Sequence, residues 1–132
     1  MKNAYPIILT PEGAGYLVTI PDFTVNTQGD SVAEAMEMAR DAIGLLGIDL
    51  EDDGKALPAP SDLWDVDAGK KGVVTLVDVD FYKYRREHDR RAVRKNCTSP
   101  AWLCYKAEQA GLNFSQILQI GLKQALELTD PD

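Results

Sequence analysis

The stretch GYLVTIPDFTVNTQGDSVAE, residues 15–34, contains the change from strand to helix that decides the fold. Its first part, Tyr16–Ile20, alternates apolar and polar residues, which is typical of a half-buried strand. Residues 24–28 are a candidate for a short third strand before the turn at Gly29. The stretch ends on a capping box. In this motif the Ser31 hydroxyl accepts a hydrogen bond from a free backbone N–H of the helix, and the Glu34 carboxylate accepts one from the backbone N–H of the cap residue. A helix is therefore expected to start at residue 31 or 32.

The residues around this stretch extend the pattern on both sides. Residues 4–10 read as a strand, and the turn PEGAG at 11–15 makes a hairpin with the next strand. Helical spacing of apolar residues continues to Leu46, and Gly47 is expected to cap the helix. A loop from residue 51 to 61 then leads to 73–79, which is rich in β-branched residues and reads as a buried strand. The prediction is an α+β module, β-β-(β)-α-β, over residues 1–80.

The remaining chain divides into a connector and a second module. Residues 81–91 are strongly charged and read equally as a helix or a flexible arm. Residues 92–99 are extended by residue type, and Pro100 enforces that conformation on its predecessor. Two helices follow, the second capped by Asn113. A single strand is not stable without a partner, so we expect residues 92–132 to dimerise by pairing this strand with that of a second copy.

Charge is distributed unevenly along the chain. Residues 1–80 contain five basic and fifteen acidic side chains, a net charge of −10, whereas residues 81–132 contain nine and six, a net charge of +3. Residues 83–95 alone carry +5. The total of −7 would argue against nucleic-acid binding, but the opposite signs of the two parts predict two different partners.

Several classes of function are disfavoured. No apolar run approaches the length of a membrane span, and the N-terminus does not resemble a signal peptide. Cys97 and Cys104 lack metal-site spacing and are expected to be reduced thiols of a cytoplasmic protein. The single histidine, His88, argues against His-based hydrolysis or a zinc site. Asp78, Asp80 and the acidic loop at 51–53 do not form a convincing metal-binding set, so we expect a protein that is not an enzyme and has no metal or other cofactor.

The second module resembles the ribbon-helix-helix family of repressors. The matching residues are RKNCTSPAWL at 94–103 and AEQAGLNFS at 107–115. The resemblance implies a two-stranded ribbon that enters the DNA major groove, with alternate positions facing the bases. If Pro100 is the strand-end proline, the outward side chains are Arg94, Asn96 and Thr98.

The same resemblance implies phosphate contacts around the ribbon. They would come from the start of the last helix, at Asn113, Phe114 and Ser115, and from Arg90 and Arg91 of the basic arm, residues 83–95. Two inward positions, Lys95 and Ser99, are polar where the family is apolar. A register shifted by one residue, which would turn Lys95, Cys97 and Ser99 to the DNA, therefore stays open.

The first module resembles the HicB family of bacterial antitoxins. The resemblance rests on Tyr5-Pro6, residues 15–23, residues 27–35 and LPAPS at 57–61, and it departs at residues 24–26, TVN, where the family commonly has Pro-Gly-Cys. It implies a partial RNase H-like domain that binds and covers a small basic HicA-type toxin that cleaves mRNA. The dimeric second module would repress the shared operon. For the toxin contact we expect the surface around Asp22 and Phe23 and the loop Glu51, Asp52 and Asp53.

Two alternatives remain at this point. The chain could be a plain repressor whose first module senses a small molecule, although no sequence feature marks a ligand pocket. The second module could serve dimerisation alone, which would leave the basic arm without a partner. Whether dimers pair into tetramers also stays open.

Overall fold

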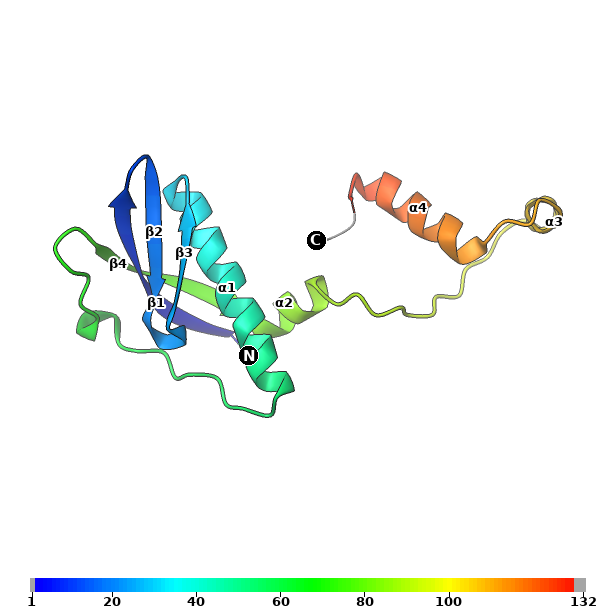
Figure 1. Cartoon of the computed structure of the whole chain (residues 1–132). Coiled ribbons are helices and arrows are strands. Elements are labelled where there is room, and N and C mark those ends of the chain that lie inside the picture. The colour runs from blue at the N-terminus through cyan, green and yellow to red at the C-terminus, as the bar shows by residue number, and fades with distance from the viewer. Residues whose placement is uncertain (1, 130–132) are drawn as a thin grey trace. The chain divides into compact units, whose positions relative to one another are not determined.

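Alternating residues and turn residues build one antiparallel sheet in the computed structural model, which describes residues 2–129. Its strands are β1 (Lys2–Glu12), β2 (Gly15–Ile20), β3 (Val25–Gly29) and β4 (Val73–Asp80), in the order β3-β2-β1-β4 (Figure 1). Every neighbouring pair is antiparallel. The expected α+β class and the third strand are both confirmed.

The hairpin and the core follow from the strand pattern. β1 and β2 close at the pair Glu12 and Gly15, where Gly13 adopts a φ of +59° that suits glycine. One face of the sheet is covered by the helix α1 (Val32–Asp52). The buried core between them comprises Tyr5, Ile7, Leu9, Val18, Ile20, Ala35, Ala39, Ile43, Val77, Val79 and Phe81.

The start of α1 is capped nearly as the sequence predicts. Ser31 Oγ accepts a hydrogen bond from the Glu34 backbone N–H at 3.1 Å. The Glu34 carboxylate in turn accepts from the backbone N–H of Asp30, also at 3.1 Å, one residue before the position expected for a capping box. Two N–H groups at the helix start are thus satisfied locally.

The end of α1 corrects the prediction that Gly47 caps the helix. The helix continues to Asp52, and Gly47 lies buried inside it, against the ring of Phe81. The glycine that ends the helix is Gly54, with a φ of +71°. Its N–H donates to Glu51 O, and that of Lys55 donates to Leu50 O. Glu51 and Asp52, expected in a loop, are consequently helical.

A short helix, α2 (Phe81–Glu87), occupies most of the expected connector. Asp80 caps it by accepting from the Lys83 backbone N–H at 3.2 Å. The Phe81 side chain is 2% exposed and belongs to the core of the sheet. The first compact unit accordingly extends through Asp89, beyond the boundary at residue 80 that the sequence suggested.

The second compact unit, Arg90–Asp132, contains the helices α3 (Ala101–Gln109) and α4 (Phe114–Leu126). Both expected helices are present, and Gly111 separates them with a φ of +69°. Residues 89–100 form neither a helix nor a hydrogen-bonded strand in the single chain. Residues 130–132 of the expected second module lie outside the described part. Within residues 2–129, no helix is both long and apolar enough to cross a membrane.

Candidate functional site: two surfaces of opposite charge

The second unit exposes apolar side chains that a folded protein normally covers. No residue of α3 or α4 is buried in the single chain. The exposed large apolar side chains of this unit include Trp102, Leu103, Tyr105, Leu112, Phe114, Ile117, Leu118, Ile120, Leu122, Leu126 and Leu128. A unit of this size without a core is typical of a segment that completes its fold against another chain.

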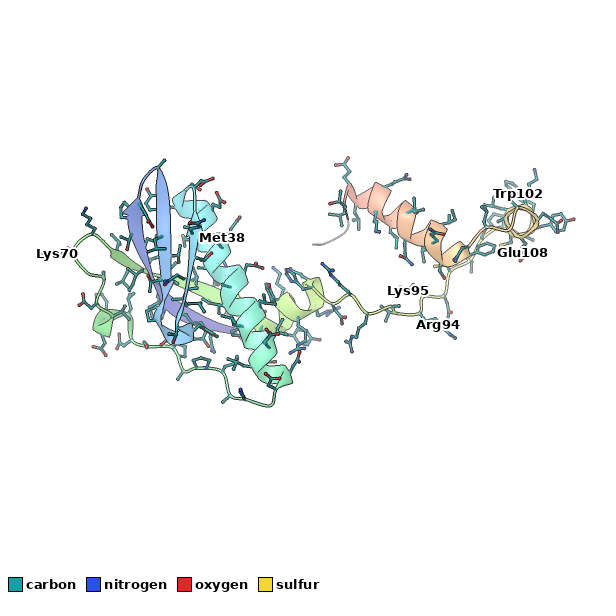
Figure 2. All side chains as sticks on the ribbon, viewed as in Figure 1. Met38, Lys70, Arg94, Lys95, Trp102 and Glu108 are labelled. Carbon is teal, nitrogen blue, oxygen red and sulfur yellow. The ribbon has the colours of Figure 1, made fainter. Side chains whose placement is uncertain are left out.

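The predicted DNA-reading side chains lie on the segment before α3. Arg94, Asn96 and Thr98 are exposed, as are Lys95 and the pair Arg90 and Arg91. Figure 2 shows Arg94 and Lys95 on this segment, with Trp102 and Glu108 on α3. The single chain does not form the ribbon that would fix which of these side chains point the same way, so the register stays a prediction.

The start of α4 has the cap that the sequence predicts. Asn113 Oδ1 accepts from the Gln116 backbone N–H at 3.1 Å. Phe114 and Ser115 occupy the first helical turn and are exposed. A phosphate at this end of the helix would meet the backbone N–H groups of these two residues and the positive end of the helix dipole.

In the first unit, Asp22 and Phe23 hold a loop. The Asp22 carboxylate accepts hydrogen bonds from the backbone N–H of Ser61, at 2.9 Å, and from its hydroxyl. Phe23 packs edge-on against Tyr5, with ring centroids 5.0 Å apart. This predicted toxin surface therefore has a structural role, because it fastens the long loop before β4 to the sheet.

The acidic end of α1 is paired with the connector. Arg85 lies 2.9 Å from a carboxylate oxygen of Asp52 and 3.4 Å from one of Glu51. These contacts, above all the hydrogen bond to Asp52, raise the pKa of the Arg85 guanidinium. Asp53, the third predicted residue, is the C-cap of α1 and is exposed. Two of the three carboxylates are thus partly neutralised within the unit.

The acids considered for catalysis have other partners. Asp78 pairs with Lys2 at 3.5 Å and with Arg40 at 3.4 Å. A backbone hydrogen bond and the contact with Lys2 lower the pKa of Asp78. Asp80 caps α2. Among residues 2–129, no three His, Cys, Asp or Glu side chains are grouped so that they could hold a metal ion.

The connector also contains the single histidine. His88 stacks on Tyr84, with ring centroids 4.0 Å apart, and Tyr84 donates a 2.6 Å hydrogen bond to Asp41 on α1. Burial, and then the contact with Asp41, raise the pKa of the Tyr84 hydroxyl. The hydrogen bond from Tyr84 to Asp41 joins α2 to α1, and His88 contributes to the structure by stacking on the Tyr84 ring.

Two features of the first unit were not anticipated from the sequence. An apolar groove of about 360 Å³ lies beside the start of α1, lined mainly by Leu9, Tyr16, Val32, Met36 and Val73. Trp64, in a short 3₁₀ turn η2 (Leu63–Asp65), is 87% exposed. The exposure of Trp64 does have a signal in the sequence, because this tryptophan lies between aspartates in a polar loop.

Comparisons with known proteins agree with one another. The family model described as "HicB_like antitoxin of bacterial toxin-antitoxin system" matches residues 5–116. The chain is 48% identical over 63 residues to "Antitoxin HicB" of Escherichia coli K12, which covers 45% of this chain and 44% of the relative. The match therefore spans less than half the length of that relative. A protein of Haemophilus phage HP1, "Uncharacterized 14.9 kDa protein in rep-hol intergenic region", is 30% identical over 109 residues, or 80% of this chain and 79% of its own.

A solved structure extends the similarity over nearly the whole chain. It is titled "Toxin-Antitoxin complex from Streptococcus pneumoniae" and has 26% sequence identity to this chain and a TM-score of 0.60. The similarity covers 95% of this chain and 99% of that one. Both compact units thus have counterparts in a protein from a toxin–antitoxin complex.

Proposed function

This chain belongs to the HicB-like antitoxin family of bacterial toxin–antitoxin systems, and from that premise we propose two activities for it. Its first unit, a partial RNase H-like domain, binds and neutralises a HicA-type toxin that cleaves mRNA. Its second unit forms a ribbon-helix-helix dimer that represses the operon encoding both proteins. The observation that carries this proposal is the family match across residues 5–116, which includes parts of both units.

The charge of the first unit supports a basic protein partner. Residues 1–89 contain eight basic and seventeen acidic side chains, a net charge of −9. An RNA-cleaving toxin needs a basic surface to hold its substrate. A strongly acidic antitoxin would be steered to that surface and would cover it, which excludes RNA without any chemical step.

The exposed apolar surface of the second unit supports dimerisation. A second copy would cover the apolar residues of α3 and α4 and pair the extended segment before α3 into a ribbon. Arg94 and Asn96 could then read guanine and adenine, and Thr98 could contact a phosphate or a thymine methyl. Arg90 and Arg91 would add phosphate contacts, whereas Lys95 would face the DNA in the register shifted by one residue.

The toxin-neutralising activity is tested by co-expression with the protein encoded by the neighbouring reading frame. Expression of that protein alone should arrest growth and cleave mRNA, and this chain should restore growth by forming a complex with it. A mixture of the purified proteins should lose RNase activity as the molar ratio approaches saturation. Undiminished toxicity in the presence of this chain would contradict the proposal.

The DNA-binding activity is tested by gel shift with the DNA upstream of the gene. Arg94→Ala and Asn96→Ala should each weaken specific binding about 5- to 150-fold, the value of one lost base contact. Sizing should show both variants as intact dimers. Ser99→Ala is the matched control, because its side chain would point toward the helices. If Ser99→Ala changes sequence preference while Arg94→Ala does not, the strand register is shifted by one residue.

One observation favours a competing function. The apolar groove beside α1 has a volume in the range of small-molecule sites. A repressor that senses a ligand there would bind its operator in the absence of any toxin and release it on ligand binding. The co-expression test separates the two functions, because such a repressor would not relieve toxicity.

A further inference from the structure

We propose that Trp64 and the aspartates around it form the surface on which the first unit docks a basic segment of its toxin. We call this set, Asp62, Trp64, Asp65 and Asp67, the Trp64 surface. The inference rests on the proposed antitoxin function and adds the place of contact. It differs from the surface expected from the sequence, which comprised Asp22, Phe23 and residues 51–53.

Trp64 is displayed outward by a fixed turn. Its side chain is 87% exposed, whereas its neighbours Leu63 and Val66 are half-buried. The Asp62 carboxylate accepts a hydrogen bond from the Trp64 backbone N–H at 3.0 Å, and the Asp65 N–H donates to the Asp62 carbonyl, also at 3.0 Å. Covering a large, exposed aromatic side chain with a partner lowers the free energy of the complex. Tryptophan is also enriched among the residues that contribute most to binding free energy at interfaces.

The loop that carries the turn is fastened to the sheet before it. The buried Tyr5 hydroxyl donates a 2.8 Å hydrogen bond to the Pro58 carbonyl. Ser61 is held by the Asp22 carboxylate of the turn after β2. Because these contacts already order the loop, a partner would not have to supply that ordering free energy on binding.

Three aspartates flank the tryptophan in the sequence. Asp62, Asp65 and Asp67 lie within six residues, and the next basic residue is Lys70, in the turn before β4 (Figure 2). Asp62 and Asp67 each accept a backbone N–H, which leaves their charge in place. Within the described chain, the Asp65 carboxylate has neither a hydrogen bond nor an ion pair. By contrast, Glu51 and Asp52 already face Arg85.

This combination selects a cationic occupant. An arginine or lysine of the partner could lie over the indole face of Trp64 while its charge meets the neighbouring carboxylates. The attraction adds to the burial of the ring, so affinity and orientation come from the same contact. A basic RNA-binding protein presents such side chains, and charge complementarity therefore favours the toxin over a second copy of this acidic unit.

The test measures binding of the full-length chain to the purified protein encoded by the neighbouring reading frame. Trp64→Ala should weaken binding about 30-fold or more, the effect of losing a dominant interface residue. Trp64→Phe should recover part of the loss. Tyr82→Ala is the matched control, since Tyr82 is an exposed aromatic of the same unit, and it should bind within about threefold of wild type. The circular dichroism spectra of all three variants should match that of wild type.

A charge comparison locates the surface independently. Asp65→Asn should slow association at low salt and flatten its salt dependence, whereas Asp53→Asn at the end of α1 should not. In a Trp102→Phe chain labelled with fluorotryptophan, Trp64 is the only tryptophan, and its fluorine signal should shift on toxin binding.

The outcomes separate the two proposals. If the wild-type chain does not bind the neighbouring protein, the proposed antitoxin function fails, and this inference fails with it. If wild type binds but Trp64→Ala binds equally well and the fluorine signal does not move, the function stands and the Trp64 surface is wrong.

Discussion

Substitution of Gly47 by alanine should destabilise the first unit, although alanine is the better helix former. Gly47 lies in the interior of α1, where its missing side chain makes room for the ring of Phe81. A Cβ at this position would overlap Cε1 of that ring and lie 2.7 Å from Cδ1. The ring is 2% exposed and also packs edge-on against Tyr5, with centroids 6.4 Å apart, so it has little space to move.

Two opposing terms set the size of the effect. Alanine in place of glycine stabilises a helix interior by about 0.8–1.0 kcal/mol. Overpacking a dense core costs about 1–3 kcal/mol, and the overlap with a fully buried ring places Gly47→Ala near the top of that range. The net loss is about 2 kcal/mol. For a unit of about 90 residues this lowers Tm by about 8–16 °C.

Calorimetry of the full chain, with a double-mutant cycle, checks the cause. Phe81→Ala alone should cost about 3–5 kcal/mol as a large-to-small core substitution. In that background Gly47→Ala should stabilise by about 1 kcal/mol, because the ring is gone and only helix propensity remains. A rise in Tm on Gly47→Ala in the wild-type background would refute the packing argument and return Gly47 to the role of an ordinary helix residue.

Two further substitutions test contacts of the sheet. Asp78→Asn should lower Tm at pH 7 by removing the pairs with Lys2 and Arg40. The folded pKa of Asp78 is depressed below its unfolded pKa of about 3.9. The difference in Tm between wild type and Asp78→Asn should therefore be complete above the unfolded pKa and should vanish as the pH falls through the folded pKa. Tyr5→Phe should cost about 1 kcal/mol by deleting the hydrogen bond to Pro58, and limited proteolysis should then cut the loop before β4 faster. Unchanged cleavage would mean that this bond does not hold the loop.

Features with local causes were predictable from the sequence. The side chain of Ser31 and that of Asn113 each reach a backbone N–H three residues on, so the helix starts follow from residue type alone. The strands follow from alternation and turn residues, and each lies within a few residues of its expected position. These features need no knowledge of the rest of the fold.

Features with distant causes were not predictable. Gly47 and Gly54 are both plausible helix ends in the sequence, and the choice between them depends on Phe81, which is more than thirty residues away from Gly47. The same contact extends the first unit beyond residue 80. A glycine can be required because the backbone has a positive φ, as at Gly54, or because another side chain packs close to the backbone, as at Gly47. The spacing of apolar residues in the sequence does not distinguish these two requirements.

The segment before α3 shows a limit of a different kind. The residue types at 92–99 favour an extended strand, but a strand needs a hydrogen-bonding neighbour, and residues 2–129 of one chain supply none for it. Sequence pattern and single-chain structure are both consistent with a strand that forms only on dimerisation. The polar inward positions Lys95 and Ser99 would make that ribbon a weaker core than an apolar one.

Net charge along the sequence predicts two partners of opposite charge, but it does not predict which surface of the first unit meets its partner. The segment 83–95 carries +5, yet Arg85 within it pairs with Glu51 and Asp52, which lie outside the segment. In the folded unit, this pairing partly neutralises one positive charge of residues 83–95 and the negative charge at the end of α1. The opposite holds around Trp64, where three aspartates flank an exposed ring in the sequence and Asp65 has no ion pair in the described chain. A partner responds to charge that is left uncompensated after folding, so the aspartates around Trp64 are a stronger candidate for the contact than Glu51 and Asp52, which face Arg85.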